Sequence, residues 1–287
     1  MIVYTDLYNR TKNYTLPEHI KEKINEKFNV QIVTTPNSKA EIYWGDKLNE
    51  DHLEKMPNIK WIHLSKTGYD KFNLPANTLI TNTPESSKGV AEFALSCILF
   101  LLRGMGKITL DRKSFDHNIE SILLFNEVKC LIVGYGRIGK KLESYLKSIG
   151  MKVGIIQRKD NIKNNLNAYD FIINTLPLNP STKNYFSIDI FGNMNPNSYI
   201  INVGRGETII EEDLIYAIKN KIIKGAFLDV VQNEPIKPNN KLLKIKNIYI
   251  SPHIANSTKN SLDIQVKSFT KNLEKYINNQ ELENIIT

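Results

Sequence analysis

The segment from Lys129 to Gly139 constrains the fold more than any other part of this sequence. It reads Lys-Cys-Leu-Ile-Val-Gly-Tyr-Gly-Arg-Ile-Gly, an apolar run followed by Gly-x-Gly-x-x-Gly. A helical pattern comes next and ends near Gly150, and a second apolar run begins at Lys152. A strand, this glycine pattern and a helix in that order predict the turn that binds the pyrophosphate of a dinucleotide.

Each glycine of this turn has a distinct expected task. Gly134 allows the tight turn, Gly136 lets the backbone approach the pyrophosphate, and Gly139 lets helix and strand pack closely. Arg137 and Ile138 open the helix, where unpaired N–H groups and the helix dipole favour an anion. We expect these five residues to bind the cofactor.

The composition describes an ordinary globular chain of about two domains. It has 287 residues, of which 41% are hydrophobic and 24% charged, and each half is long enough to bury a core. The formal charge is +8, but the lysines are scattered and no basic run alternates with aromatic residues. We therefore expect a solvated lysine surface and no nucleic-acid partner.

Cysteine usage and apolar runs indicate the compartment. Cys97 and Cys130 lie in apolar runs, which predicts buried thiols, no disulfide framework and no metal site. The N-terminal residues indicate a strand, so no signal peptide is expected. The longest apolar run, Phe93–Leu102, is about half the length that spans a bilayer. We expect a cytoplasmic protein without a membrane segment.

From Cys130 onward, six apolar, β-rich runs are separated by several helical patterns. The runs are Cys130–Val133, Val153–Ile156, Phe171–Asn174, Tyr199–Asn202, Ala226–Asp229 and Ile248–Ile250. This alternation predicts a doubly wound parallel sheet of the Rossmann type, built from two βαβαβ halves. The clearest helices follow Gly136 and cover Glu211–Lys219, whereas the polar stretch Asn161–Ala168 predicts only a short helix.

Residues 1–84 show a second, smaller α/β pattern, expected to form a flavodoxin-like substrate domain. The expected elements are strands at Ile2–Thr5, Val30–Val33, Glu41–Trp44 and Trp61–Leu64, and helices at Glu18–Phe28 and His52–Met56. Thr81-Asn-Thr-Pro84 indicates a boundary turn, before a long helix at about Val90–Arg103. The helical segment Leu262–Ile277 is expected to return to the first domain. The substrate domain would then be 1–84 plus 256–287, and the inserted dinucleotide-binding domain 85–255.

Four polar residues follow the later apolar runs: Arg205, Asp229, Glu234 and His253. In an open α/β sheet the ligand lies beyond the carboxyl ends of the strands, where these residues are expected to meet. Arginine binds a carboxylate with a planar fork, and histidine exchanges a proton near neutral pH. Each residue alone is more often a solvated loop charge. Together, at the edge that carries the glycine turn, they predict an active site.

Five motifs suggest a family. They are Ile200-Ile-Asn-Val-Gly-Arg-Gly206 with Ile210-Glu-Glu-Asp-Leu214, Gly225-Ala-Phe-Leu-Asp-Val-Val-Gln-Asn-Glu-Pro235, Ser251-Pro-His-Ile-Ala255, Leu176-Pro-Leu-Asn-Pro-Ser-Thr182 and Val90-Ala-Glu-Phe-Ala94. From about Ile59 to Asn256, the chain resembles the D-isomer-specific 2-hydroxyacid dehydrogenases. The resemblance implies that Arg205 binds the substrate carboxylate and polarises the 2-oxo group. It also implies that His253 protonates the carbonyl oxygen, and that Glu234 orients His253 and keeps it protonated.

The resemblance assigns further contacts to the cofactor and the substrate. Asp229 would contact the nicotinamide end of the cofactor. Leu176, Pro177 and Thr182, in the loop that covers the cofactor, and Val203 are expected to bind it as well. The loop Ser65–Gly68, with Lys66, Thr67 and Gly68, would bring N–H groups to the substrate carboxylate across a cleft between the domains. A homodimer is implied too.

The choice of cofactor follows from a departure at the end of the second strand. NAD-binding sheets of this type carry an Asp or Glu there, which binds the ribose hydroxyls. Here the position is Gln157, followed by Arg158 and Lys159. A neutral residue beside two cations suits a 2′-phosphate, so we favour NADP over NAD. The alternative is that both cations face solvent and that cofactor choice is lax.

Two more departures concern the dimer and the substrate. The segment Gly104–Asn126 is short and holds Phe115 where relatives often carry a tryptophan, so the dimer contact is reduced or rebuilt. Lys66 stands where many relatives have an uncharged residue. It either binds a second acidic group or points to solvent.

The expected function is that of an NADPH-preferring reductase of a small 2-oxoacid, with glyoxylate or hydroxypyruvate as substrate. One alternative is oxidation of a phosphorylated acid such as 3-phosphoglycerate, with Lys66 as phosphate partner. Another is a dinucleotide-sensing protein like the transcriptional corepressors of this fold. The set Arg205, Glu234 and His253 argues against pure sensing.

Overall fold

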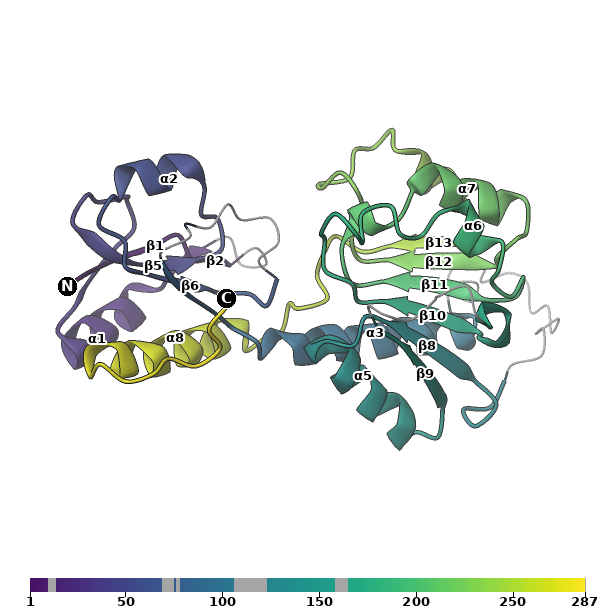
Figure 1. Cartoon of the computed structure of the whole chain (residues 1–287), viewed down its shortest axis with the longest axis horizontal. Coiled ribbons are helices and arrows are strands. Elements are labelled where there is room, and N and C mark those ends of the chain that lie inside the picture. Colours follow the sequence, from purple (N-terminus) through teal and green to yellow (C-terminus); the bar gives the residue numbers. More distant parts are fainter. Residues whose placement is uncertain (10–13, 69–74, 76–77, 106–122, 158–164, 287) are drawn as a thin grey trace, which may run out of the picture. The chain divides into compact units, whose positions relative to one another are not determined.

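The chain forms two compact units, each built on a parallel sheet (Figure 1). The computed structural model describes residues 1–9, 14–68, 75, 78–105, 123–157 and 165–286. Unit 1 comprises Met1–Ser86 and Ser257–Thr287, and unit 2 is Ser87–Asn256. Unit 1 therefore comes from two separate stretches of chain, and unit 2 from the continuous stretch between them.

Unit 1 contains a five-stranded parallel sheet in the order β4-β1-β5-β6-β7. Its strands are β1 (Ile2–Thr5), β4 (Gln31–Val33), β5 (Ala40–Gly45), β6 (Trp61–Leu64) and β7 (Leu79–Asn82). Counted along the chain this order is 2-1-3-4-5, the flavodoxin-like arrangement, as predicted. A short antiparallel pair, β2 (Tyr8–Asn9) and β3 (Tyr14–Thr15), is separate from this sheet.

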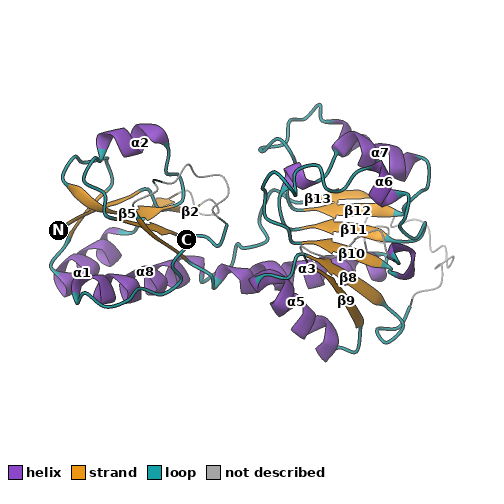
Figure 2. Ribbon diagram, in the orientation of Figure 1, coloured by secondary structure: helices purple, strands orange, loops and turns teal. Residues whose placement is uncertain are grey.

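Helices cover both faces of the unit 1 sheet (Figure 2). The helices are α1 (Glu18–Phe28) and α8 (Ser261–Ile277) on one face and α2 (Glu50–Lys55) on the other. Neighbouring strand residues alternate between the two cores, as strand geometry requires. In the core beneath α8, the ring of Phe269 stacks on Trp44 at 4.1 Å and also lies 5.6 Å from Trp61. The helix near the C-terminus thus completes a core begun by strands far earlier in the chain.

Strand β7 corrects one prediction. Thr81-Asn-Thr-Pro84 was expected to be a turn, but Thr81 and Asn82 belong to the edge strand β7. The residues near the C-terminus pair with the outer side of this strand, because Asn82 N donates to Asn284 O at 3.2 Å and Ile286 N donates to Ile80 O at 2.8 Å. The second half of this strand, Thr81 and Asn82, is polar, so no apolar pattern continues there and the sequence resembles a turn.

Unit 2 contains a six-stranded parallel sheet in the order β13-β12-β11-β10-β8-β9. Its strands are β8 (Lys129–Val133), β9 (Lys152–Ile156), β10 (Phe171–Asn174), β11 (Tyr199–Asn202), β12 (Gly225–Leu228) and β13 (Ile248–Ile250). They coincide with the six predicted runs to within one residue at each end.

In the described part of unit 2, helices cover both faces of this sheet. The helices are α3 (Ser86–Leu102) and α5 (Arg137–Ser148) on one face and α6 (Ile188–Phe191) and α7 (Glu211–Lys219) on the other. The helices α3 and α5 share one core with the strands, and α6 and α7 share the second. The sheet is therefore doubly wound, as predicted.

The strand order refines the prediction of two equal halves. Counted along the chain the order is 2-1-3-4-5-6, so that β10 lies on the other side of β8 from β9. Within the described part of the crossover from β9 to β10, the helical residues are the single turn Leu166–Ala168, at the end of the stretch predicted to hold a short helix. The order of the strands reverses between β8 and β10. Open α/β sheets bind their ligands at such a point.

Two further sequence predictions concern the cysteines and membrane-spanning helices. Cys97 and Cys130 are free and buried, and burial raises the pKa of both thiols, that of Cys130 to about 12. In the described residues, no helix is both long and apolar enough to cross a bilayer.

We predict that His63 makes unit 1 sensitive to acid. This fully buried ring contacts the hydroxyls of Thr81, at 2.8 Å from Nδ1, and Thr83, at 3.2 Å from Nε2. Burial lowers its pKa from 6.5 to about 3. Because the pKa of His63 is lower in the folded state than in the unfolded state, protonation of His63 does not reduce the free energy of unfolding above about pH 6.5. Below that pH, protonation lowers this free energy by about 1.4 kcal/mol per pH unit as the pH falls toward 3.

The measurement is the free energy of unfolding in urea at several pH values between 6.5 and 4.5. His63→Gln keeps a hydrogen-bonding side chain that takes up no proton. The free energy of unfolding of this variant should therefore fall less steeply with falling pH, by the amount that corresponds to uptake of about one proton. Equal slopes in the two proteins would contradict the prediction.

Candidate active site

The glycine turn connects β8 to α5 as predicted. Gly134 has a φ of +96°, in the region that favours glycine, and its N–H donates to Ile156 O at 3.0 Å. A Cβ atom on Gly139 would lie 2.4 Å from Gly134 O, so the helix approaches the turn too closely for any side chain. Sequence and geometry agree on why both positions are glycine.

Gly136 leaves room for a ligand at the start of α5. It is the N-cap residue of this helix and, as a glycine, has no side chain to cap the first N–H groups. A Cβ atom on Gly136 would meet no described atom within 4 Å. Arg137 and Ile138 form the first turn, so their N–H groups open onto this space. An open space before a helix N-terminus fits the pyrophosphate of a dinucleotide.

The loop after β10 lies against the glycine turn. Thr175 Oγ1 donates to Gly134 O at 2.7 Å, which joins the two loops at the point where the strand order reverses. Leu176 and Pro177 follow Thr175. Thr182 is buried, and its hydroxyl donates to Pro177 O at 2.6 Å, which closes the loop on itself. The predicted cofactor loop is thus a compact turn beside the predicted phosphate turn.

The residues expected to select the cofactor are only partly described. Gln157 directly follows β9 and is exposed, at the position where an acidic residue would bind the ribose hydroxyls. Arg158 and Lys159 lie outside the described residues, as does Phe115.

His253 and Glu234 form a hydrogen-bonded pair. His253 Nδ1 lies 2.7 Å from Glu234 Oε2, and both side chains are partly exposed. The backbone of His253 has a φ of +53°, which is rare for a residue with a side chain and is held by N–H bonds to Asp229 O and Ser251 O, both 2.9 Å. Because the carboxylate binds Nδ1, the pair fixes the ring and leaves proton exchange to Nε2.

Asp229 positions the loop that carries His253. The residue is buried, and its Oδ1 accepts hydrogen bonds from Ser251 Oγ at 2.7 Å and Ile254 N at 2.9 Å. Its Oδ2 accepts one from Ala255 N at 3.0 Å. The resemblance assigned this carboxylate to the nicotinamide end of the cofactor. In the structure, three donors from the histidine loop bind it.

Arg205 lies in the loop after β11, and this loop touches the loop of Glu234. Val203, the first residue of the loop, is buried and donates its N–H to the carbonyl at the end of β10. A Cβ atom on Gly206 would lie 2.0 Å from Val231 C, so the two backbones are in contact there. Val231 N in turn donates to Glu234 Oε1 at 3.3 Å. The structure therefore joins the loops of Arg205, Glu234 and His253 at one edge of the unit 2 sheet.

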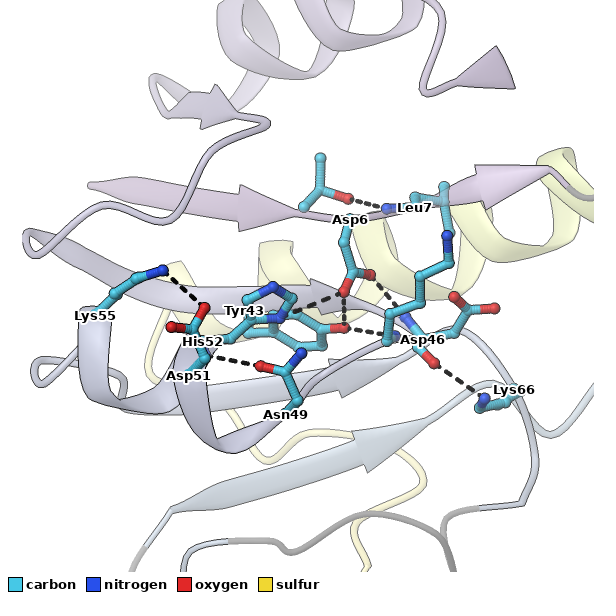
Figure 3. A network of polar contacts seen from close by, with 11 residues as sticks. Asp6, Leu7, Tyr43, Asp46, Asn49, Asp51, His52, Lys55 and Lys66 are labelled. Atoms are coloured by element: carbon cyan, nitrogen blue, oxygen red, sulfur yellow. Dashed lines mark hydrogen bonds and ion pairs between the residues drawn. The ribbon is translucent and has the colours of Figure 1, made fainter. Parts of the chain in front are cut away.

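The candidate substrate residues lie in unit 1, in the loop after β6. Lys66 Nζ donates to the carbonyl oxygen of Asp46 at 3.0 Å (Figure 3). The carbonyl of Thr67 accepts from Asn82 Nδ2 at 2.7 Å, and Gly68 is half-buried. Hydrogen bonds to neighbouring strand ends thus fix this loop on its own sheet.

A partly buried polar cluster supports the same edge of unit 1. Tyr43 Oη donates to Asp6 Oδ2 at 2.6 Å, Asp46 N donates to Asp6 Oδ1 at 2.9 Å, and His52 Nδ1 lies 3.9 Å from Asp6 Oδ2 (Figure 3). Burial raises the pKa of the Asp6 carboxyl, and the two hydrogen bonds oppose that rise. Asp6 and Asp46 were not candidates from the sequence, although each directly follows an apolar run, the signal that identified Arg205.

Comparisons with known proteins identify the family. Residues 95–255 match the family described as D-isomer specific 2-hydroxyacid dehydrogenase, NAD binding domain. The chain belongs to this family. It is 30% identical to the glyoxylate reductase of Thermococcus litoralis over 255 residues, and this match covers 79% of this chain and 77% of the reductase. The family is one of NAD(P)-dependent oxidoreductases that act on the CH–OH group of 2-hydroxyacids.

Two further similarities bear on length and fold. The chain is 28% identical to the D-3-phosphoglycerate dehydrogenase of Methanocaldococcus jannaschii over 264 residues, which are 84% of this chain but only 50% of that one. The solved NADPH-dependent glyoxylate/hydroxypyruvate reductase of Sinorhizobium meliloti, in complex with NADP and sulfate, has a TM-score of 0.83 at 20% identity. The match covers 99% of this chain and 98% of the reductase, and it shows that the two chains share a fold.

We predict that Asp229→Asn loosens the histidine loop. The variant replaces a buried oxygen that accepts a backbone N–H by an amide, which leaves an unpaired donor and should destabilise the protein by about 1–3 kcal/mol. Urea unfolding measures this loss. Asp170→Asn is the matched control, because the Asp170 carboxylate accepts the N–H of Lys129 at an exposed site. Equal losses in the two variants would contradict the role of Asp229.

Proposed function

We infer that this protein reduces a small 2-oxoacid, such as glyoxylate or hydroxypyruvate, to the D-2-hydroxyacid with NADPH. The observation that carries this inference is the His253–Glu234 pair, 2.7 Å apart, on loops joined to that of Arg205. These loops follow strands of the sheet that carries the glycine turn. The name of the Thermococcus litoralis relative supports the choice of substrate.

The residues divide the work between binding and proton transfer. The guanidinium of Arg205 binds the substrate carboxylate with its planar fork and polarises the 2-oxo group. NADPH, when bound, would supply the hydride that the carbonyl carbon accepts. His253 donates a proton from Nε2 to the carbonyl oxygen, and Glu234 stabilises the imidazolium before that transfer. Glu234 also sets which ring nitrogen faces the substrate.

The cofactor would be held by the glycine turn and the two loops that follow β9 and β10. Gly134, Gly136 and Gly139 form the turn, and Arg137 and Ile138 present their N–H groups to the pyrophosphate. The loop Leu176–Thr182, with Pro177, and the residue Val203 border the same strand ends. Asp229 would contact the nicotinamide end of the cofactor, and its hydrogen bonds also position the histidine loop.

Unit 1 would also contribute to binding of the substrate. Residues 1–84 and 256–287 form the substrate domain of this proposal, and residues 85–255 the dinucleotide-binding domain. The loop of Lys66, Thr67 and Gly68 offers backbone N–H groups to the substrate carboxylate. The resemblance and the frequency of symmetric dimers support a homodimer as the active form.

A second candidate is oxidation or reduction of a phosphorylated acid. The specific observation is Lys66, whose ammonium is anchored on the carbonyl of Asp46 rather than extended into solvent. An ammonium held at a strand end could bind a phosphate. The 30% identical relative from Thermococcus litoralis is a glyoxylate reductase, so this candidate stands second.

We predict that the purified protein consumes NADPH with glyoxylate or hydroxypyruvate. The loss of NADPH absorbance measures the rate. Pyruvate and 3-phosphohydroxypyruvate are assayed separately as alternative substrates. His253→Ala should lower turnover by about a hundredfold or more, because general acid catalysis contributes about that much.

Cofactor binding is the control for the histidine variant. His253→Ala should bind NADPH as the wild type does, since the side chain lies outside the glycine turn. Turnover near the wild-type rate would show that another group is the acid. Turnover with 3-phosphohydroxypyruvate alone would favour the second candidate.

We predict that NADPH is preferred over NADH, and that Gln157→Asp reverses the preference. An acid at the end of β9 repels the 2′-phosphate of NADP and binds the ribose hydroxyls of NAD. The measurement is the ratio of kcat/KM for the two cofactors, which should shift toward NADH by about tenfold or more. An unchanged ratio would refute the charge argument. Gln280→Asp, at an exposed position after α8 in unit 1, is the control.

A further inference from the structure

Two asparagines lie buried side by side at the ends of neighbouring strands. Asn174 ends β10 and Asn202 ends β11, and they are paired in register. Both are fully buried. Asn174 Nδ2 donates to Asn202 Oδ1 at 2.9 Å and to Thr208 Oγ1 at 2.6 Å. A buried amide is retained only where its polar atoms find partners, so this arrangement has a specific geometry to maintain.

The hydrogen bonds of this group converge on the backbone of Arg205. Asn202 Nδ2 donates to Arg205 O at 3.0 Å, and Thr208 Oγ1 donates to the same oxygen at 2.6 Å. Asn202 Oδ1 also accepts from Gly204 N at 3.1 Å. Because the Thr208 hydroxyl must accept from Asn174, its own proton is directed to Arg205 O. The chain of donors therefore has one direction, from Asn174 to the arginine loop.

The same group also fixes the predicted cofactor loop. Asn174 Oδ1 accepts the N–H of Leu176 at 3.0 Å. A Cβ atom on Gly204 would lie 2.7 Å from Leu176 O, so the arginine loop packs directly on this residue. One buried amide thus holds both loops, one expected to bind the cofactor and one the substrate carboxylate.

We propose that Asn174, Asn202 and Thr208 are positioning residues that set where the Arg205 guanidinium lies relative to the cofactor loop. The proposal rests on the proposed function for its consequence in catalysis, but the position of Arg205 can be measured without activity. A small displacement of a group that binds the substrate lowers kcat/KM steeply. The Thr208 hydroxyl is the link to remove, because valine has the same shape without the hydrogen bonds.

Thr208→Val is the test, and Thr208→Ser is the conservative rescue. The first variant should lower kcat/KM for glyoxylate by about tenfold or more, chiefly through KM, while NADPH binds within about twofold of the wild type. The serine variant keeps the hydroxyl and should restore kcat/KM. Thr270→Val in α8 is the matched control, since that hydroxyl donates to Val266 O within a helix of unit 1.

The second readout is the NMR signal of Arg205 Nε–Hε, assigned by its loss in Arg205→Lys. It should move in Thr208→Val and stay in place in Thr208→Ser and Thr270→Val. A merely structural role would lower the melting temperature of Thr208→Val without moving this signal or changing kcat/KM per NADPH-binding site. That result would overturn the proposal.

The two readouts separate this proposal from the proposed function. If the wild type reduces no 2-oxoacid, the proposed function fails, and the Arg205 signal still decides the positioning role. A signal that stays in place in Thr208→Val refutes positioning even in an active enzyme. A signal that moves while kcat/KM is unchanged refutes its importance for catalysis.

Discussion

Polar side chains buried at the carboxyl ends of parallel strands are the constraint on which both sheets depend. A buried carboxylate or amide without partners costs more free energy than its burial contributes, so each such group must hold a neighbouring segment. Asp229 holds the loop of His253 in this way, and Asn174 with Asn202 holds the loop of Arg205. Asp6 does the same for the segment that begins at Asp46 in unit 1. Hydrogen-bonded polar groups, more than the apolar cores, place the candidate site.

The features that the sequence predicts are those set by neighbouring residues. The strands of unit 2 are mainly apolar runs of three to five residues, and the glycine pattern determines the turn before α5 without help from distant parts of the chain. The order of strands and helices then places the ends of β11, β12 and β13 at one edge. Arg205, Glu234 and His253 could therefore be proposed together before their contacts were known.

The features that the sequence does not predict depend on partners far along the chain. The sequence of strand β7 resembles a turn because Thr81 and Asn82 are polar. They belong to a strand only because segments far along the chain pair with it and bury them. The partners of Asp229 come from the loop more than twenty residues later, so the carboxylate alone does not show that it supports this loop. The position of β10 beside β8 depends on the crossover from β9, which carries no strong helical pattern.

The stacking of Phe269 on Trp44 has a consequence for how the chain folds as it is synthesised. Residues 87–256 contain every strand of their own sheet and leave the ribosome as one continuous stretch. The strands of unit 1 emerge first, yet the face of Trp44 and Trp61 is covered only when α8 arrives. Exposed aromatic surface promotes aggregation during folding. The core between the strands of unit 1 and α8 is therefore completed only after residues 87–256 have been made.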